Sequence, residues 1–514
     1  MKKDKKTTNI NRKNILALVI LIGGNLLFFM TLWLCSKYDH IYLDQILFQL
    51  KSPSVGANKN LLSSAYIRVG LFGALLTVFE IVLYFVLAGK LERKFSKIGV
   101  YVKYCASKMC SFCKTVALPF ALSTLLVACT FFLARLKVGS YLITTSTESD
   151  FIETHYVDPE KIQIDFPESK RNLIYIFLES MENTYGDVSI GTPINDNFMP
   201  ELYYLAENNV NFSHNDRVGG ALSYTGTTWT SAALVSQTAG VLIKVPVESQ
   251  GYGTEETFLS GANSIGEILQ KQGYNQTLLV GSDADFGGRK AYFKEHGNYN
   301  IVDINSLKAE GRLDPDYRVW WGFEDKRLFG YAKEEIMKLY EKGEPFNFTM
   351  LTCDTHFPDG YVCEDCDDDY EQQYSNVISC SSKQVYEFVN WIKEQPFYDN
   401  TTIVISGDHL TMDPEYLKDL DKNYTRTVYN CIINSVVQPV QEKNRSFGTF
   451  DMFPTTLAAM GAEINGERLG LGTNLFSSIP TLTEIYGYER LDEIMQKKSI
   501  FYNEQILEME KIGA

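Results

Sequence analysis

Three long apolar stretches near the N-terminus constrain this chain most strongly. Ile15 to Leu34, Val69 to Ala88 and Thr115 to Leu133 are each close to the length that crosses the roughly 30 Å hydrocarbon core of a bilayer. We therefore expect three transmembrane helices followed by a separate domain. The expected division is a membrane anchor over residues 1–137, a juxtamembrane connector over 138–170 and a C-terminal domain over 171–514.

The first apolar stretch has a signal peptide as its alternative, because six basic residues precede it. Its apolar run is longer than the core of a typical signal peptide. No small-x-small cleavage site follows in Ser36 to Asp39. These two features favour a membrane anchor.

Basic residues predict the orientation of this anchor, since short loops rich in Lys and Arg stay in the cytoplasm. Six basic residues precede the first stretch and seven lie between the second and third, but only four, Lys37, Lys51, Lys59 and Arg68, lie between the first and second. We therefore expect a multi-pass membrane protein with its N-terminus in the cytoplasm and its C-terminal domain outside, extracellular or periplasmic. A chain rich in Lys, Asn and Ile with an anchor of this orientation suits a bacterial cell membrane.

Charge differs between the two parts of the chain. Residues 1–137 carry a net charge of +14 and the remainder carries −29. A strongly acidic domain argues against a nucleic-acid partner, because such binding depends on neutralising phosphates.

Glu80 and the C-terminal cysteines allow more than one interpretation. Glu80 lies within the second apolar stretch, where a carboxylate suggests either a polar partner on another helix or a role in lipid handling. Cys363 or Cys366 could form a disulfide with Cys380, which an oxidising compartment permits. A zinc site built on the Cys363-x-x-Cys366 dyad is the alternative.

Strand and helix signals alternate after Lys170. Apolar runs predict buried strands at 173–178, 276–280, 348–351 and 402–405, and helical periodicity covers 264–272, 326–339 and 382–393. This alternation predicts an α/β fold, with a mostly parallel central sheet flanked by helices.

Candidate metal ligands follow two of these strands. Glu179 comes directly after the first strand, and Asp408 and His409 come directly after the last. Ligands of open α/β sheets bind beyond the carboxyl ends of the strands. Two carboxylates and an imidazole at one sheet edge suit Mn²⁺, Mg²⁺ or Zn²⁺. Another segment, Asp354 to His356, occupies a similar post-strand position.

The nucleophile is expected in the Gly226 to Ser231 stretch. Thr230 is the first choice because a helix pattern begins at Ser231, and the N-terminus of a helix favours bound phosphate. Thr227 and Thr228 compete with it for the same role.

Several ordered motifs resemble the phosphoglycerol transferase I and lipoteichoic acid synthase family, in the sulfatase-like branch of the alkaline phosphatase superfamily. The resemblance covers about residues 150 to 475. It is carried by Asp165 to Ser180, Thr225 to Thr230, Gly288-Arg289-Lys290, Trp320-Trp321-Gly322, Asp354-Thr355-His356 and Gly407-Asp408-His409.

The resemblance implies roles for individual residues and an alkaline-phosphatase/sulfatase-like fold. Thr230 would be the catalytic nucleophile. One divalent ion, with Mn²⁺ preferred over Mg²⁺ and Zn²⁺, would be held by Glu179, Thr230, Asp408 and His409. Substrate binding would fall to His356, Arg289 and Trp321.

Two departures from related patterns refine the expected activity. Lipoteichoic acid synthases carry a further histidine where this chain has Val280, which disfavours polymerisation. No Cys/Ser-x-Pro-x-Arg motif surrounds Thr230, which disfavours sulfate ester hydrolysis.

The expected function is a metal-dependent transferase that moves glycerophosphate from phosphatidylglycerol to an extracellular glycan or teichoic-acid-type acceptor through a phospho-threonine. A phosphoethanolamine transferase or a phosphodiesterase of the same fold is the alternative within this class. A non-catalytic, membrane-tethered glycan-binding or sensor protein is the alternative from another class.

Overall fold

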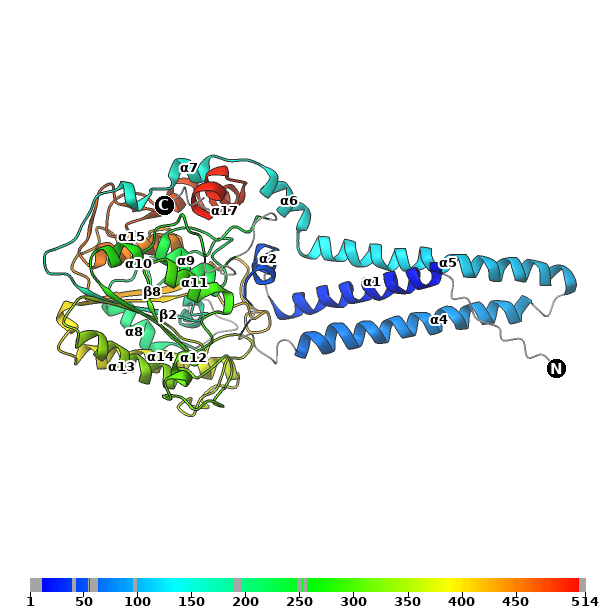
Figure 1. Ribbon diagram of the computed structural model, residues 1–514, viewed down its shortest axis with the longest axis horizontal. Helices are drawn as coiled ribbons and strands as arrows, with labels where there is room; N and C mark the ends of the chain where they lie inside the picture. Colours follow the sequence, from blue (N-terminus) through cyan, green and yellow to red (C-terminus); the bar gives the residue numbers. More distant parts are fainter. Residues whose placement is uncertain are drawn as a thin grey trace. The chain divides into compact units, whose positions relative to one another are not determined.

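The computed structural model describes residues 12–38, 43–53, 55, 63–95, 99–188, 196–246, 252 and 257–507. The chain forms two compact units (Figure 1). The smaller unit comprises residues 1–41 and 58–141, and the larger comprises 42–57 and 142–514. Lys2, Lys3, Lys5 and Lys6, which contribute to the predicted orientation, lie outside the described residues.

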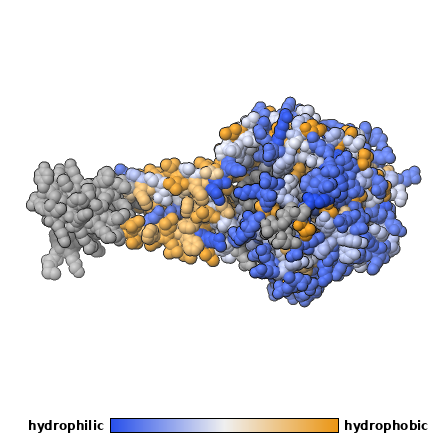
Figure 2. All heavy atoms as spheres, turned by 180° about the vertical axis from the view of Figure 1, so that it is seen from behind, coloured by the Kyte–Doolittle hydropathy of each residue, from blue (hydrophilic) through white to orange (hydrophobic). Residues whose placement is uncertain are grey.

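The smaller unit is built of long helices: α1 (Arg12–Lys37), the π-helical turn η1 (Tyr66–Leu71), α4 (Phe72–Phe95) and α5 (Gly99–Arg135). Three segments of this unit, Ile15–Lys37, Ser63–Leu83 and Ala117–Arg135, are long and apolar enough to cross a membrane. Figure 2 shows the hydrophobic surface that these segments present. The second segment begins and ends several residues earlier than expected. The helices continue beyond the apolar stretches, so much of the basic region between the second and third is helical.

Glu80 has a polar partner on another helix. Asn25 of α1 donates from Nδ2 to the Glu80 carboxylate at 2.7 Å and to Thr77 Oγ1 at 3.0 Å. A hydrogen-bonded partner lowers the cost of a carboxylate among apolar helices. The bond to Asn25 therefore favours the first interpretation of Glu80, a carboxylate with a polar partner on another helix.

The larger unit contains a seven-stranded sheet in the order β3-β8-β7-β2-β6-β4-β5. Its strands are β2 (Asn172–Leu178), β3 (Gly220–Ala221), β4 (Asn275–Val280), β5 (Asn300–Val302), β6 (Phe346–Leu351), β7 (Thr401–Gly407) and β8 (Val428–Ile433). Five adjacent strands of the sheet, β5, β4, β6, β2 and β7, run parallel to one another. Strand β8 is antiparallel to both of its neighbours, β7 and β3. The prediction of a mostly parallel sheet is confirmed.

Central strand β2 is buried along its whole length, as expected of a strand covered on both faces. Side chains alternate across the sheet. Ile174, Ile176 and Leu178 join the large apolar core on one face. On the other, the Tyr175 hydroxyl donates to Gln237 of α9 at 2.9 Å.

Helices cover both faces of this sheet (Figure 1). One layer contains α8 (Pro200–Asn208), α12 (Ile304–Ala309), α13 (Asp325–Tyr340) and α14 (Gln373–Lys393). The other contains α9 (Thr230–Ala239), α10 (Ile265–Lys271), α11 (Arg289–Glu295) and α15 (Met452–Ala459). The predicted helices at 264–272 and 326–339 are confirmed almost to the residue.

Some elements differ from the sequence prediction. Helix α14 begins nine residues before the expected start at Ser382, because its first turns are rich in Ser and Asn, which carry little helical signal. Strands β5 and β8 were not predicted. The remaining strands are the pairs β1 (Ile164–Asp165) with β9 (Glu463–Ile464) and β10 (Arg468–Leu469) with β11 (Gly472–Thr473).

The segment expected as a connector carries α6 (Val138–Ser146), α7 (Phe151–His155) and β1, and its residues from 142 onward belong to the larger unit. The remaining helices of this unit are α2 (Leu43–Lys51), α16 (Leu482–Tyr486) and α17 (Tyr488–Gln496). Short 3-10 or π turns lie at Pro159–Lys161, Asn183–Tyr185, Phe286–Gly288, Tyr398–Asn400, Thr449–Asp451 and Tyr502–Leu507.

Helix α2 packs into the larger unit although it lies in sequence between the first two apolar segments. Phe48 is fully buried and contacts three aromatic rings. The ring centroids of Trp229, Tyr252 and Phe258 lie 5.3, 5.4 and 6.2 Å from its own. This short segment is therefore part of the domain that carries the candidate active site.

Candidate active site

Glu179, Asp408 and His409 meet at one edge of the sheet. Strands β2 and β7 are parallel neighbours in which Leu178 is paired with Gly407, so the residues that follow them emerge side by side. One ligand atom from each of the three side chains lies within 4.8 Å of the others, and all three side chains are buried. Strand pairing thus brings together residues far apart in sequence.

Ser180 connects two of these residues. Its backbone N–H donates to Asp408 Oδ1 at 2.7 Å and its hydroxyl donates to Glu179 Oε1 at 2.8 Å. Its φ of 54° is in the left-handed region, which costs an L-residue about 1–2 kcal/mol. Strain of this kind persists only where surrounding contacts impose it. The sequence analysis included Ser180 in a motif but gave it no role, because no sequence pattern marks a strained backbone.

The acceptor atoms of this cluster face one another. His409 Nδ1 lies 2.8 Å from the Leu410 carbonyl, which can only accept, so Nδ1 carries the proton and Nε2 presents a lone pair. Nε2 lies 3.4 Å from Asp408 Oδ2 and 3.6 Å from Glu179 Oε1. Asp408 Oδ2 has no hydrogen-bond partner among the described residues. A cation between these atoms would satisfy all three.

Burial and charge also fit a bound cation. Burial raises the pKa of the Asp408 carboxyl well above its ordinary value, and the nearby Glu179 charge raises it further. Burial acts in the same direction on Glu179, but His356 and His409 hold the pKa of Glu179 below its ordinary value. Two adjacent buried carboxylates with one imidazole nitrogen are a donor set for a divalent ion such as Mn²⁺, Mg²⁺ or Zn²⁺.

Thr230 is the threonine that contacts this cluster. Its Oγ1 lies 3.3 Å from Glu179 Oε2 and 3.4 Å from His409 Nε2, and the residue is only partly buried. Thr227 is fully buried and its hydroxyl bonds to the backbone of Tyr224. The Thr228 hydroxyl is buried and has no partner among the described residues.

Thr230 is also the first residue of α9, after Trp229 at the N-cap. Trp229 makes no side-chain cap bond, so it does not satisfy the first N–H groups of the helix. Free N–H groups and the positive end of the helix dipole attract a phosphate. The hydroxyl of Thr230 and an anion-binding helix end are therefore at the same place.

His356 and Trp321 form an aromatic wall close to the cluster. Their ring centroids are 4.7 Å apart, and His356 also stacks on Phe357. His356 Nδ1 lies 2.6 Å from the Phe357 carbonyl, so its Nε2 is the unprotonated nitrogen of the neutral ring. Burial lowers the pKa of His356 below its ordinary value of 6.5, against the opposing charge of Glu179.

Arg289 begins α11 and is almost fully buried. Its Nε donates to the Phe286 carbonyl at 3.0 Å, and its Nη2 donates to Ser282 Oγ and the Asp283 carbonyl at 3.0 and 2.7 Å. These bonds hold the loop that follows β4. Two of its three guanidinium nitrogens thus bind the protein itself.

Asp354 does not join the metal cluster. Its Oδ2 accepts the backbone N–H of Asp325, and the Asp325 carboxylate accepts the N–H groups of Cys353 and Asp354. Burial raises the pKa of Asp325 to about 7 and that of Asp354 to about 10. This buried pair orders the loop that carries His356. Sequence reasoning missed Asp325, because an acid at a helix start is common.

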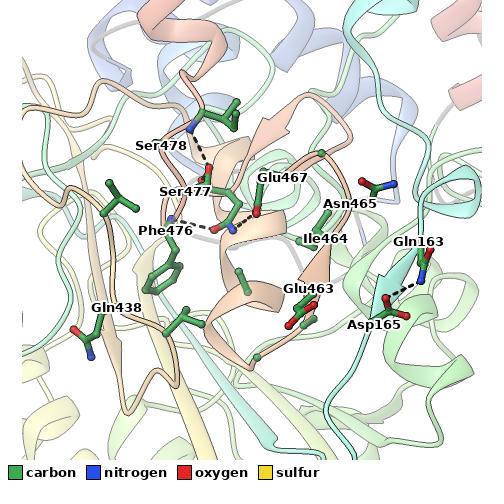
Figure 3. A pocket seen from close by; sticks show the side chains of 18 residues that line it. Gln163, Asp165, Gln438, Glu463, Ile464, Asn465, Glu467, Phe476, Ser477 and Ser478 are labelled. Atoms are coloured by element: carbon green, nitrogen blue, oxygen red, sulfur yellow. Dashed lines mark hydrogen bonds between the residues drawn. The ribbon is translucent and has the colours of Figure 1, made fainter.

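A cavity of about 970 Å³ lies elsewhere (Figure 3). Its lining includes Gln163, Asp165, Glu463 and Phe476, and none of the candidate site residues. It also includes residues just after β8, which ends beside the start of β7. The cavity therefore lies toward the opposite edge of the sheet and is not part of this site.

Comparisons with known proteins agree on a family. The sulfatase family model matches residues 171–462. Phosphoglycerol transferase I from Salmonella choleraesuis is 31% identical over 342 residues, which cover 65% of this chain and 42% of that protein. Phosphoglycerol transferase I from Citrobacter koseri is 30% identical with the same coverage. The chain thus spans about 42% of the length of these curated relatives.

Among solved structures, the phosphoethanolamine transferase that acts on lipooligosaccharide in Neisseria meningitidis aligns with a TM-score of 0.49 at 12% identity, covering 88% of this chain and 84% of that one. The lipoteichoic acid synthase of Listeria monocytogenes aligns with a TM-score of 0.46 at 18% identity, covering 64% of this chain and 80% of that one.

Proposed function

This chain belongs to the sulfatase family, and we propose that it is a membrane-anchored phosphoglycerol transferase. In this proposal it moves glycerophosphate from phosphatidylglycerol to a glycan or teichoic-acid-type acceptor, with a phospho-threonine as intermediate. The observation that carries the proposal is the contact of Thr230 Oγ1 with both Glu179 and His409. Similarity to proteins named phosphoglycerol transferase I supports the choice of transferred group.

Glu179, Asp408 and His409, together with the Thr230 oxygen, would hold one divalent ion, for which Mn²⁺ is our first choice. When bound, such an ion lowers the pKa of a coordinated hydroxyl and neutralises charge on phosphoryl oxygens. The orphaned Asp408 Oδ2 and the free lone pair of His409 Nε2 support this assignment.

In the first step, Thr230 Oγ1 attacks the phosphorus of the donor phosphodiester. The bond from phosphorus to the diacylglycerol oxygen breaks, and the threonine proton ends on the departing diacylglycerol. Glycerophosphate stays on Thr230 as a phosphodiester. The N–H groups that begin α9 would stabilise the phosphoryl oxygens, since helix N-termini bind such anions.

In the second step, an acceptor hydroxyl attacks the same phosphorus and the bond to Thr230 breaks. The acceptor proton passes to His356 Nε2 and then to the released Thr230 oxygen, so atoms and charges balance. His356 suits this role because its ring is neutral and its Nδ1 proton is directed at Phe357. A double displacement of this kind predicts ping-pong kinetics.

Trp321 and Arg289 would contribute to substrate binding in different ways. Trp321 is buried against the rings of Phe286 and His356 and its Nε1 has no partner among the described residues, so it can orient His356 and donate to a glycerol or phosphate oxygen. Arg289 would act with its remaining nitrogen, Nη1, while its other donors hold the loop after β4.

Two sequence features support transfer of a single glycerophosphate rather than sulfate hydrolysis or polymerisation. Thr230 lies outside any Cys/Ser-x-Pro-x-Arg motif, and Val280 stands where lipoteichoic acid synthases have a histidine. Thr230 therefore lacks the motif that sulfate hydrolysis uses, and Val280 cannot replace the histidine of the polymerising enzymes.

The packing of α2 supports the proposed orientation outside the membrane. Residues 42–57 follow the first apolar segment and belong to the same compact unit as the C-terminal domain. Three crossings would put both on the same side of the membrane, in agreement with this contact. Basic residues at the N-terminus support the assignment of this side to the outside of the cytoplasm.

The decisive experiment incubates the full chain in detergent with Mn²⁺ and phosphatidylglycerol and maps any adduct by peptide mass spectrometry. We expect a glycerophosphate mass on Thr230, lost in Thr230→Ala and retained in the neighbouring control Thr228→Ala. Phosphatidylethanolamine in place of phosphatidylglycerol tests the alternative donor. An adduct on Thr227 or Thr228, or none with either lipid, would contradict the proposal.

A further inference from the structure

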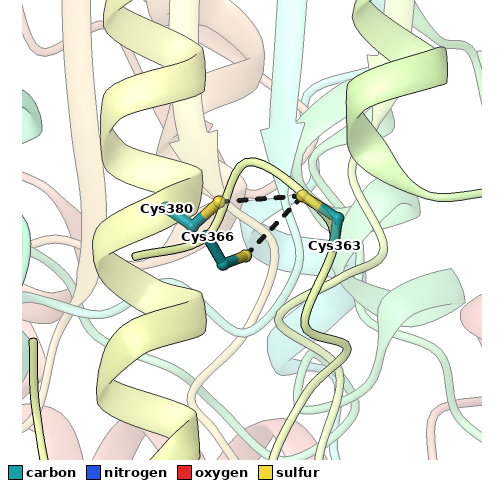
Figure 4. A group of neighbouring side chains, drawn as sticks. All are labelled: Cys363, Cys366 and Cys380. Atoms are coloured by element: carbon teal, nitrogen blue, oxygen red, sulfur yellow. Dashed lines mark hydrogen bonds between the residues drawn. The ribbon is translucent and has the colours of Figure 1, made fainter. Parts of the chain in front are cut away.

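A second cluster of potential metal ligands lies apart from the candidate active site. Cys363 and Cys366 lie in the loop after β6, and Cys380 lies on α14 (Figure 4). Cys363 Sγ is 3.6 Å from Cys366 Sγ and 3.8 Å from Cys380 Sγ. All three sulfurs lie within 4.8 Å of one another, and Cys363 and Cys380 are buried.

These distances discriminate between a disulfide and a metal site. A disulfide has an S–S length of about 2.05 Å, so none of the three cysteines is bonded to another, and all seven described cysteines are free. Four sulfurs bound tetrahedrally to zinc at about 2.3 Å lie about 3.8 Å apart along each edge. The two Sγ distances from Cys363 match such an edge.

The arrangement of the ligands along the chain also suits zinc. Structural zinc sites commonly take two cysteines from one Cys-x₂-Cys turn and further ligands from a separate element. Here the loop supplies Cys363 and Cys366, and α14 supplies Cys380. A metal ion bound to all three cysteines would join the loop to α14.

Neighbouring polar groups favour thiolates. Gln384, one turn after Cys380 on α14, donates from Nε2 to the sulfurs of Cys380 and Cys363 at 3.3 and 3.4 Å. Donors of this kind stabilise negative charge on metal-bound sulfur. Three acidic residues of the same loop form ion pairs with lysines: Glu364 and Asp365 bind Lys326, and Asp367 binds Lys383. These three carboxylates are therefore paired with lysines.

We propose that Cys363, Cys366 and Cys380 bind one Zn²⁺ ion as three thiolates, with an oxygen or nitrogen ligand in the fourth place. This site is chemically distinct from the cluster of Glu179, Asp408 and His409, whose oxygen-rich donors favour harder ions. It does not depend on the proposed transferase activity.

A bound ion here would stabilise the loop that carries His356. Asp325 and Asp354 hold the beginning of this loop through backbone hydrogen bonds, and the cysteine site would hold its later part to α14. The loop between β6 and α14 has little regular structure of its own. We infer that the ion has a structural role, with His356 as the residue that it helps to position.

The test uses the full chain, purified in detergent without chelator, with its zinc replaced by Co²⁺. Thiolate-bound Co²⁺ gives an intense charge-transfer absorption in the near ultraviolet that oxygen and nitrogen ligands do not give. We expect one thiolate-bound Co²⁺ per chain. The band should be lost in Cys363→Ser and Cys380→Ser, and retained in Cys353→Ser and Asp408→Asn.

A measurement on the unmodified chain covers the case in which the cysteine variants do not fold. Titration with a mercurial that caps thiols should release one Zn²⁺ per chain as the three cysteines react, recorded with a colorimetric zinc indicator. Absence of the cobalt band in the fully reduced chain would overturn the proposal. A disulfide between any two of the three cysteines in protein isolated without reductant would also overturn it.

Discussion

At the scale of single residues, the environment of Thr230 separates it from two neighbouring threonines. Thr227 is a turn residue, since its hydroxyl both donates to and accepts from the Tyr224 backbone. Thr230 is partly exposed at a helix start and faces the buried Glu179 and His409. Accessibility and contact with the cation-binding cluster are what a nucleophile requires.

His356 leads to a prediction about pH. Burial lowers its pKa below 6.5, and the proposed reaction needs its neutral form to accept a proton. Transfer should therefore be constant above neutral pH and fall as the pH drops through a value below 6.5. His356→Gln should reduce the plateau rate by about 10²–10⁴-fold, the usual contribution of a general base.

The measurement is the pH dependence of transfer from phosphatidylglycerol for both forms of the enzyme. A direct binding assay for Mn²⁺ at each pH separates loss of the cation from protonation of His356. If the His356→Gln variant lost activity over the same low pH range while its metal stayed bound, a group other than His356 would cause that loss.

At the scale of elements, the candidate site depends on the ends of two adjacent strands and the start of one helix. Glu179 and Asp408 are brought together by the register of β2 and β7, and Thr230 by the packing of α9 on the same sheet, where Gln237 donates to the Gly407 carbonyl at 2.9 Å. Ser180 then connects the two acidic residues, with its backbone N–H donating to Asp408 and its hydroxyl donating to Glu179.

Helix α2 supports this arrangement from a distant part of the sequence and yields the second prediction. Phe48 is fully buried beside Trp229, the residue before Thr230. Phe48→Ala should destabilise the larger unit by about 3–5 kcal/mol, the usual cost of removing a buried phenyl ring. It should also lower transferase activity, because the N-cap of α9 loses a packing partner.

Leu50→Ala on the same helix is the matched control, since Leu50 is 76% exposed and its loss should change stability by less than about 0.5 kcal/mol. Thermal unfolding of both variants in detergent gives the comparison. Equal melting temperatures for the two variants would show that α2 does not pack as the structure describes.

At the scale of the whole molecule, charge and hydrophobicity divide the chain into a basic, apolar part and an acidic, polar part. A net charge of −29 after residue 137 would repel anionic lipid headgroups at long range. In the proposed function, recognition of a phospholipid donor would therefore rest on the divalent cation and on local side chains. Anchoring would also raise the local concentration of the proposed lipid donor.

The third prediction concerns topology. Leu50 and Val440 are 76% and 70% exposed, and both belong to the larger unit. In intact cells, Leu50→Cys and Val440→Cys should both react with a thiol reagent that cannot cross the membrane. Lys13→Cys, before the first apolar segment, should react only after the membrane is made permeable.

The amount of label above the parent protein is measured by mass spectrometry after the same exposure time. Labelling of only one of the two outer positions would contradict a shared side for α2 and the C-terminal domain. Labelling of all three in intact cells would contradict three crossings.

The sequence alone was enough to predict the three apolar helices, the fold class and the four parallel strands β2, β4, β6 and β7. These depend on local hydrophobic length and period, which are visible in a short window of residues. It also indicated Glu179, Asp408 and His409, because residues after parallel strands share one edge. Short or partly polar elements such as β5 and the first turns of α14 carry too little local signal.

Tertiary structure decided what depends on contacts between distant residues. It separated Thr230 from Thr227, gave Asp354 a backbone role with Asp325, and placed α2 in the larger unit. It also brought Cys380 to Cys363 and Cys366 without a disulfide. Hydrogen-bond partners, burial and sulfur spacing arise only when the elements pack, so the chain order cannot reveal them.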